Sequence, residues 1–491
     1  MKIASLALYT VLGMALTSAT VYSATAPEPP ARDPKVLSQL DDDTRPRFDR
    51  DPDDPTAPVD KSHFTAGATL MMNGRIGHPT MAAGRPDETF LFVDVNTEGA
   101  DVGVTTTAPV NLAIVIDTSG SMEGQRIANA TAAARGMIDR LRDGDTVSVV
   151  GYSTNTEIMV PATTVSPATR PQIISRIAAI STTGHTCMSC GIEAGMQMLA
   201  RRTGAVNRML LLSDGEANRG ITDLGGLQGL AADIRQRGAS ISSIGVDVDY
   251  NERVMLALAR ESNGRHHFVE DASRLQAAFD AELQSLVKTI GKQAQLSVEL
   301  APGVNLAQVF DRTFQQVGNR VIVPLGTFTL GDNKTVLMRL STPSRPAGEQ
   351  PIARVDLVYD DLVTGRQGSC HGELATIMSD DPTRVSDLDA VVLGRLTKSE
   401  TAATLQQAND LFARGDNSGA RQLIQRQSVT NSDRRKKAKK SKPKGWSGPD
   451  PFAGLDKPLE QADAGFANAP ASREGRAQVK QNAEDIDQLS L

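Results

Sequence analysis

One stretch limits what this chain of 491 residues can fold into more than any other. Residues 112–116 form an uninterrupted apolar run, which predicts a strand that is buried on both faces. The run ends at Asp117, small polar residues follow, and from Gly124 onward apolar side chains recur at helical spacing. A buried strand, a polar loop and a helix make half of a β-α-β unit, and open α/β sheets bind ligands at the carboxyl ends of such strands.

The polar loop after this strand carries a set of oxygen atoms. Asp117, Ser119 and Ser121 occupy alternate positions, so their side chains can converge on one point. One carboxylate and two hydroxyls suit a hard divalent cation and are poor ligands for zinc or copper. The sequence therefore predicts a cation site at the end of the first buried strand.

Three motifs, in order along the chain, resemble one known family. The D-x-S-x-S pattern of residues 117–121 resembles the metal-ion-dependent adhesion site of von Willebrand factor type A domains. The Gly-His-Thr sequence of residues 184–186 resembles the G-x-T loop of that family. Residues 209–215, an apolar run that closes in Ser-Asp-Gly, resemble its second acidic strand end. The resemblance covers residues 111–290 and is closest to secreted bacterial members.

This resemblance implies a ligand set and a mode of binding. The implied metal ligands, bound directly or through water, are Asp117, Ser119, Ser121, Thr186 and Asp214. The implied ion is Mg²⁺, with Mn²⁺ or Ca²⁺ as alternatives, and one coordination position is left for an acidic group of a protein partner. The chemistry agrees, because two carboxylates only balance a divalent cation and an open position attracts another oxygen anion.

Strands and helices alternate along residues 111–290. This alternation predicts an α/β fold with a doubly wound, mostly parallel sheet. Right-handed crossovers, together with the resemblance, imply the strand order 3-2-1-4-5-6. That order places the strands that precede Asp117 and Asp214 side by side, so we expect the two acids to face one cation.

The segments on either side of this unit have a different pattern. Residues 63–110 and 291–380 contain short runs of β-branched and apolar residues separated by turn residues, which predicts flanking segments of a small antiparallel β-sandwich. We expect the two segments to complete one β domain, into which the α/β unit is inserted.

The last part of the chain has two predicted regions. Helical spacing predicts a C-terminal helical hairpin over residues 385–430, and composition predicts a disordered tail over residues 431–491. The basic block at residues 434–444 has two interpretations, attraction to an anionic lipid, wall polymer or nucleic acid, or a solvated linker. The net charge of −6 argues against a nucleic-acid-binding protein.

The first residues predict export. Residues 1–23 combine one lysine, a short apolar run and small residues, as in a secretory signal peptide, and the Pro- and Asp-rich residues 24–62 predict a disordered linker. We therefore expect the protein in the periplasm, the cell envelope or the extracellular space. No other stretch is long and apolar enough for a transmembrane span, so none is expected in the mature chain.

The sequence contains 3 cysteines, and two of them form a C-x-x-C motif directly after Thr186. Three interpretations of Cys187 and Cys190 stay open. They form a local disulfide that stiffens the metal loop, they are reduced structural or metal-binding thiols with Cys370 and His371 as further ligands, or they serve a thiol oxidoreductase.

No catalytic motif stands out, since the chain has no phosphate-binding loop, dinucleotide-binding loop or nucleophile elbow. The principal hypothesis is an exported, non-enzymatic adhesion or scaffold protein that binds a carboxylate of a protein partner through its metal. The alternative is a thiol redox protein that uses Cys187 and Cys190.

Overall fold

The computed structural model describes residues 60–490 apart from 101–107, 200–201, 203 and 442–449. The predicted signal peptide, residues 1–23, lies outside the described residues, as does the predicted linker except for residues 60–62. Within the described part of the chain, no helix combines the length and the apolar character that a bilayer crossing requires.

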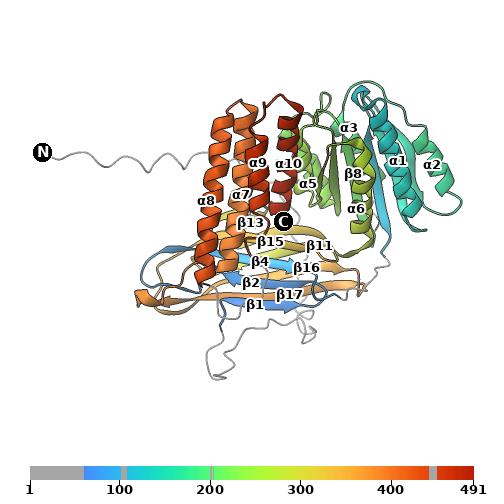
Figure 1. Ribbon diagram of the computed structural model, residues 1–491. Helices are drawn as coiled ribbons and strands as arrows, with labels where there is room; N and C mark the ends of the chain where they lie inside the picture. The colour runs from blue at the N-terminus through green and yellow to red at the C-terminus, as the bar shows by residue number, and fades with distance from the viewer. Residues whose placement is uncertain (1–59, 101–107, 200–201, 203, 442–449, 491) are drawn as a thin grey trace. The chain divides into compact units, whose positions relative to one another are not determined.

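The predicted α/β unit is a six-stranded sheet with the order β10-β9-β8-β5-β6-β7 (Figure 1). Numbered from β5, this is the predicted order 3-2-1-4-5-6, which is confirmed. Only the edge strand β7 runs antiparallel to its neighbour β6. The strands are β5 (Val110–Asp117), β6 (Thr146–Tyr152), β7 (Thr156–Thr164), β8 (Val206–Ser213), β9 (Ala239–Val246) and β10 (His266–Val269).

Helices cover both faces of this sheet, which explains the uninterrupted apolar run of β5. Leu112, Ile114 and Ile116 pack with helices α1, α2 and α6 on one face, whereas Ala113 and Val115 pack with α3, α4 and α5 on the other. Every residue of β5 is buried. The helices are α1 (Gln125–Arg140), α2 (Arg170–Ala178), α3 (Met188–Met198), α4 (Leu224–Gln236), α5 (Glu252–Glu261) and α6 (Leu275–Val287).

The β domain is built from both flanking segments, as expected. One sheet has the order β1-β2-β4-β15-β12 and the other β13-β14-β11-β16-β17-β3, so strands from before and after the α/β unit pair directly. The longest such pairing joins β4 to β15 from Asp87↔Thr342 to Asn96↔Asn333. One pair departs from the antiparallel expectation, because β3 and β17 are parallel.

The strands of this domain enclose a core to which both flanking segments contribute, with Phe64 and Val93 from one and Leu296 and Val355 from the other. The strands are β1 (His63–Gly67), β2 (Met71–Ile76), β3 (Thr80–Ala82), β4 (Asp87–Asn96), β11 (Thr289–Leu300), β12 (Asn305–Phe310), β13 (Gln315–Val317), β14 (Arg320–Thr329), β15 (Asn333–Thr342), β16 (Gly348–Asp361) and β17 (Arg366–Ser379). The α/β unit is therefore an insertion between β4 and β11.

The C-terminal region differs from its prediction. The helical hairpin is present as α7 (Ala390–Ala413) and α8 (Asn417–Ser441), but the disordered tail is wrong for residues 431–441 and 450–490. There α8 continues, and α9 (Asp456–Gly465) and α10 (Arg473–Ser490) follow and lie beside α7, α8 and α5 (Figure 1). The physical reason is that this region buries apolar side chains, although its overall composition is polar and charged. Those buried against α7 and α8 are Phe452, Leu455, Leu459, Phe466, Ile486 and Leu489.

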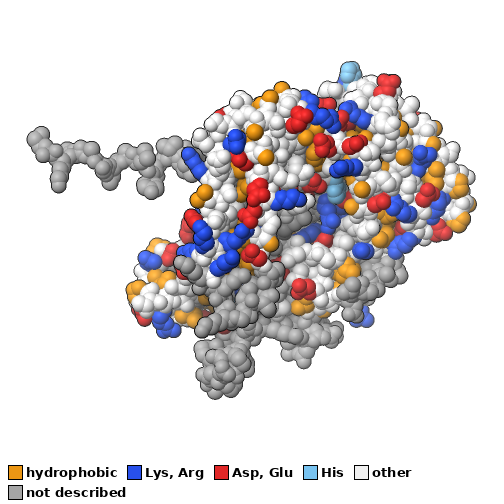
Figure 2. Space-filling model, in the orientation of Figure 1, with side chains coloured by type: hydrophobic (Ala, Val, Ile, Leu, Met, Phe, Trp, Pro, Cys, Tyr) orange, Lys and Arg blue, Asp and Glu red, His pale blue; other side chains and the backbone are white. Residues whose placement is uncertain are grey.

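Part of the basic block at residues 434–444 forms ion pairs within this bundle. Arg434 pairs with Glu400 and Arg435 with Asp456. Lys436 and Lys437 also lie close to acids. Figure 2 shows basic and acidic side chains mixed over these helices. The two arginines are therefore partly buried and paired with acids in the bundle, whereas the side chains of Lys436 and Lys437 are largely exposed.

Phe466→Ala tests whether the C-terminal helices are part of the packed structure. Phe466 is fully buried, and its ring centroid lies 4.6 Å from that of Phe412. We expect the substitution to lower the free energy of unfolding of this region by about 3–5 kcal/mol. Val429→Ala on the exposed side of α8 is the control and should change it by less than about 0.5 kcal/mol. Hydrogen exchange of α9 and α10 measures both, and equal effects would contradict the packing.

Candidate metal site

Two buried carboxylates meet at the carboxyl ends of β5 and β8. The strands are neighbours in parallel register, with Ile116 opposite Leu212, so Asp117 ends one strand beside Ser213 at the end of the other. Asp214 follows directly, and both acids are fully buried. The hydroxyl of Ser213 donates to Asp117 Oδ2 at 3.0 Å and ties the two strand ends together.

The serine hydroxyls form a chain between the two acids. The backbone N–H of Ser119 donates to Asp117 Oδ1 at 2.9 Å. Its hydroxyl lies 3.0 Å from that of Ser121, which donates in turn to Asp214 Oδ1 at 2.8 Å. A short 3₁₀ turn, Gly120–Met122, holds this arrangement. The residues of the D-x-S-x-S motif and the second acid therefore lie together as predicted.

Thr186 reaches the same point from a separate loop. The Gly120 N–H donates to the carbonyl of Gly184 at 3.2 Å, which holds this loop against residues 119–123, here called the serine turn. A Cβ placed on Gly215 would lie 3.7 Å from Ser121 Oγ and 3.9 Å from Thr186 Oγ1, so both hydroxyls border the same small space. The structure thus brings all five predicted residues together.

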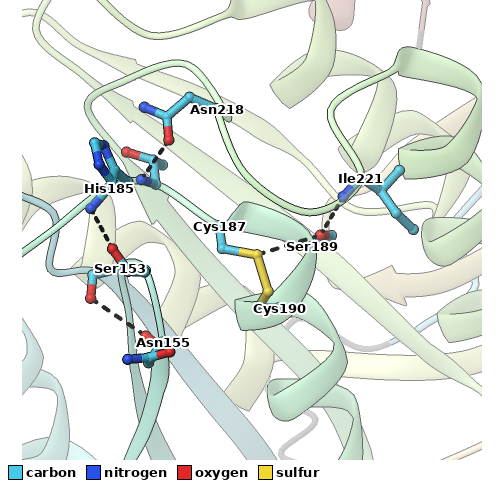
Figure 3. The surroundings of a disulfide bond; sticks show 10 residues. Ser153, Asn155, His185, Cys187, Ser189, Cys190, Asn218 and Ile221 are labelled. Carbon is cyan, nitrogen blue, oxygen red and sulfur yellow. Dashed lines mark hydrogen bonds between the residues drawn. A yellow bond between two sulfur atoms is a disulfide. The ribbon is translucent and has the colours of Figure 1, made fainter.

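The sequence analysis missed Asn218 and Arg126. Asn218 Oδ1 accepts a hydrogen bond from the Thr186 N–H at 3.0 Å, and the Asn218 N–H donates back to the Thr186 carbonyl (Figure 3). Arg126 Nη1 donates to Asp214 Oδ2 at 2.8 Å and to the Ser121 carbonyl at 3.0 Å. Asn218 stands four residues after a recognised motif acid, which is a weak local signal. Arg126 gives no such signal, because the acids that it contacts, Asp214 and Asp247, are distant in sequence.

Arg126 also connects the site with a second group of acids. Its other guanidinium nitrogen bonds Asp247, which follows β9 in a left-handed conformation with φ of 62°. Asp247 Oδ1 accepts a further hydrogen bond, at 2.6 Å, from Arg473 at the start of α10. The C-terminal helices are therefore joined to the charge network around the site.

Burial makes the ionised form of both carboxylates costly. Burial raises the pKa of Asp117 to about 6; the hydrogen bonds from Ser119 oppose the shift and the charge of Asp214 adds to it. Burial likewise raises the pKa of Asp214, against the hydrogen bond from Ser121 and the charge of Arg126. A cation placed between the two acids would relieve both costs.

Cys187 and Cys190 are joined in a disulfide, with their Cα atoms 5.3 Å apart (Figure 3). Cys187 precedes α3, and its N–H donates to the Ser153 carbonyl at 2.9 Å. The structure therefore contains the local disulfide of the first interpretation. The interpretation as metal-binding thiols with Cys370 is wrong, because Cys370 is buried in the β-domain core. In the described residues no cluster of three or more His, Cys, Asp or Glu side chains is arranged to bind a metal.

Comparison with known proteins agrees with this fold. A family model for the von Willebrand factor type A domain matches residues 111–281. Residues 111–281 form a von Willebrand factor type A (VWA) domain. A solved structure described as von Willebrand factor type A from Catenulispora acidiphila has a TM-score of 0.68 at 17% identity and covers 86% of this chain and 97% of that chain. The similarity to this structure includes the β domain and shows a shared fold.

Two bacterial relatives share sequence with this chain. The uncharacterized protein sll0103 of Synechocystis is 26% identical over 329 residues, or 65% of this chain and 77% of that protein. The uncharacterized protein YfbK of Escherichia coli is 28% identical over 196 residues, or 39% of this chain and 34% of that protein. The chain thus spans about a third of the Escherichia coli relative.

Asp117→Asn tests the electrostatic cost of the site in metal-free protein. Because the folded-state pKa of about 6 lies above the ordinary value of 3.8, the ionised side chain costs stability at pH 7, and this cost disappears as the pH falls through 6 toward 4. Asp117→Asn should therefore be more stable than wild type at pH 7 in chelator, by on the order of 2 kcal/mol, and should lose this advantage near pH 4.

Thermal unfolding at a series of pH values measures this difference. Asp233→Asn, at an exposed position of α4, is the control and should show no such gain. Loss of stability at pH 7 in Asp117→Asn would contradict the account.

Proposed function

We propose that the VWA domain binds one Mg²⁺ ion through Asp117, Ser119, Ser121, Thr186 and Asp214, either directly or through water. Mn²⁺ and Ca²⁺ are the alternatives. The observation that carries the proposal is the pair of fully buried carboxylates with raised pKa values beside three converging hydroxyls. All the candidate ligands offer oxygen, which is the donor that these ions prefer.

We further propose that the bound ion recruits a carboxylate of a protein partner. Gly120, Ser121 and Glu123 on the serine turn are exposed, so a partner can approach this side of the site. Two carboxylates only neutralise a divalent ion, and an open position favours a third oxygen anion. The protein then acts as an adhesion or scaffold protein without catalysis of its own. Recovery of a partner from envelope extract in Mg²⁺, and its loss in chelator, tests this step.

Export is part of the same proposal. It rests on the leader-like residues 1–23 and on the Cys187–Cys190 disulfide, since such bonds persist in oxidising compartments such as the periplasm and the extracellular space. Fractionation of cells and N-terminal sequencing of the recovered protein test it. Recovery of the chain with Met1 intact from the cytosol would contradict it.

Arg126 gives the site a counter-charge that a metal ion must compete with. Its guanidinium occupies one oxygen of Asp214, while the other oxygen accepts from Ser121. A divalent cation bound to Asp214 repels the guanidinium of Arg126, which lies 2.8 Å from the same carboxylate. Asp247 already accepts a hydrogen bond from this guanidinium as its second partner. We infer that Arg126 balances Asp214 in metal-free protein and shifts its charge toward Asp247 when the ion binds.

Asp214→Ala is the direct test of metal binding. Wild-type protein at an Mg²⁺ concentration one hundred times the dissociation constant should gain about 2.7 kcal/mol of stability. Asp214→Ala should lose this gain and keep its fold, because the acid follows the end of β8 and its removal relieves the repulsion between two buried carboxylates in metal-free protein. Melting temperature with and without Mg²⁺ measures both.

The matched control for this experiment is Asp233→Ala on the exposed side of α4, which should keep the full gain. An Asp214→Ala protein that is still stabilised by Mg²⁺ would remove Asp214 from the ligand set.

The disulfide supports a second candidate function, thiol exchange by Cys187 and Cys190. The sulfur of Cys187 is poorly placed for attack, because Cys187 is only 2% exposed and a Cβ on the neighbouring Gly220 would lie 2.7 Å from its sulfur, whereas Cys190 is partly exposed. Thiol exchange requires access to a sulfur atom. An insulin-reduction assay separates the two functions, and activity that is lost in Cys187→Ser would favour the redox function.

Reduction of the disulfide should weaken metal binding more than it lowers the melting temperature. The ring is very short, so its loss adds little entropy to the unfolded chain. It directly follows Thr186, whose hydroxyl borders the site. Mg²⁺ titration and thermal unfolding, with and without reductant, measure the two effects. The Cys187→Ser, Cys190→Ser double variant is the control and should not respond to reductant. Unchanged Mg²⁺ affinity in reduced wild type would contradict the prediction.

A further inference from the structure

A cavity lies at the end of the VWA sheet opposite the metal site, where this domain meets the β domain. Its volume is about 600 Å³, which falls in the range of small-molecule sites. The lining comes from the amino ends of β8 and β9, the carboxyl ends of α4 and α5, and strands β11, β13 and β14. The metal site lies at the carboxyl ends of β5 and β8, so the two sites are separate.

Two polar groups of the lining have no hydrogen-bond partner among the described residues. The hydroxyl of Ser240, a residue only 4% exposed, makes no hydrogen bond, and neither does the buried Nδ2 of Asn263. Buried polar groups without a partner cost about 1–3 kcal/mol each, and structures retain them where a ligand or water satisfies them. The Asn263 amide nitrogen can only donate, which calls for an acceptor in the ligand.

The charges of the lining favour an anion. Among the described residues, Asp360 lies 3.7 Å from Lys292, and Arg235 lies 2.7 Å from Glu261, so these charges are matched within the protein. Arg237, at the end of α4, has no ion pair with any described residue. A guanidinium presents a fork of N–H donors that fits a carboxylate or phosphate.

The backbone of β11 is shaped at the same place. The pairing of β11 with β14 shifts register between Gly291 and Ala294, and Gln293 within this bulge has φ of 53°. The conformation brings its amide to Gly238, where an added Cβ would lie 2.7 Å from Gln293 Nε2. A left-handed non-glycine residue costs about 1–3 kcal/mol, and bulges often redirect side chains beside binding sites. Phe314, which is 37% exposed, adds an apolar surface to the same lining.

We propose that this cavity binds a small anionic, hydroxyl-rich ligand, either a sugar acid or a sugar phosphate. Arg237 binds the oxyanion, and the hydroxyl of Ser240 and the amides of Asn263 and Gln293 bind ligand hydroxyls. Phe314 contacts the apolar face of the ring. Carboxylate and phosphate share this recognition chemistry, and the choice of probes distinguishes them.

Isothermal titration of the full chain with digalacturonate and with glucose 6-phosphate tests the proposal. Glucose and maltose are the neutral comparators, and inorganic phosphate tests whether the anion alone suffices. At least one anionic sugar should bind about tenfold more tightly than either neutral sugar, as expected for one charge-assisted pair. Absence of binding by both anionic sugars at millimolar concentration, or equal binding of the neutral sugars, overturns the proposal.

Two variants assign the binding to this cavity. Arg237→Gln should weaken the anionic sugar about tenfold, whereas Arg274→Gln, a control at an exposed arginine remote from the lining, should not. Ser240→Ala should leave the ligand-free protein as stable as wild type or more stable, because it removes an unpartnered hydroxyl, and should still weaken the sugar. Equal affinity of wild type and Ser240→Ala, or equal losses in both arginine variants, overturns the assignment.

The same titration in chelator, and in Asp117→Ala, separates this site from the metal site. Binding of the anionic sugar should be unchanged in both conditions. Loss of sugar binding in chelator would show that the sugar binds at the metal and would overturn the cavity proposal without affecting the proposed metal function.

Discussion

The structure around the site depends on the placement of two carboxylates in a buried position at the ends of adjacent parallel strands. Asp117 and Asp214 are both fully buried, and the hydroxyl of Ser213 holds Asp117 at the junction. Burial without sufficient positive charge raises the pKa of both groups, which is a cost that folding must offset elsewhere. The offset comes from the continuous apolar packing of β5 between two helical layers.

The neighbouring elements are arranged around this charge. The serine turn, the Thr186 loop and Arg126 each contribute donors or hydroxyls to the two acids or to the space between them. Asp247 shares Arg126 with Asp214, and Arg473 of α10 bonds Asp247 in turn. The C-terminal helices therefore belong to the same charge network as the VWA site, in addition to the apolar contacts that hold them against α7 and α8.

Sequence reasoning succeeded where local pattern and chemistry coincide. The apolar run before Asp117 predicted a strand buried on both faces, the three ordered motifs predicted the five residues that meet, and strand–helix alternation predicted the sheet order. Arg126 could not be predicted, because its partners Asp214 and Asp247 become neighbours only when β8 and β9 pair in the fold. The cavity at the domain junction depends in the same way on tertiary contact.

The error in the C-terminal tail has a different cause. In α10 the residues Val479, Ala483, Ile486 and Leu489 recur at helical spacing and pack into the helical cluster, so a signal was present. The preceding run of lysines and the Pro- and Gly-rich stretch conceal it, because they dominate the composition of residues 431–491. Ion pairs such as Arg435 with Asp456 then neutralise part of the block that composition alone marks as solvated.

The central claim is that these oxygens hold a divalent ion, and the most direct measurement is anomalous diffraction from crystals of the full chain grown with Mn²⁺. The account predicts one strong anomalous peak between the carboxylates of Asp117 and Asp214 and the hydroxyls of Ser119, Ser121 and Thr186. No peak at this position in saturating Mn²⁺, or a peak only at the exposed acid Asp249, would contradict it.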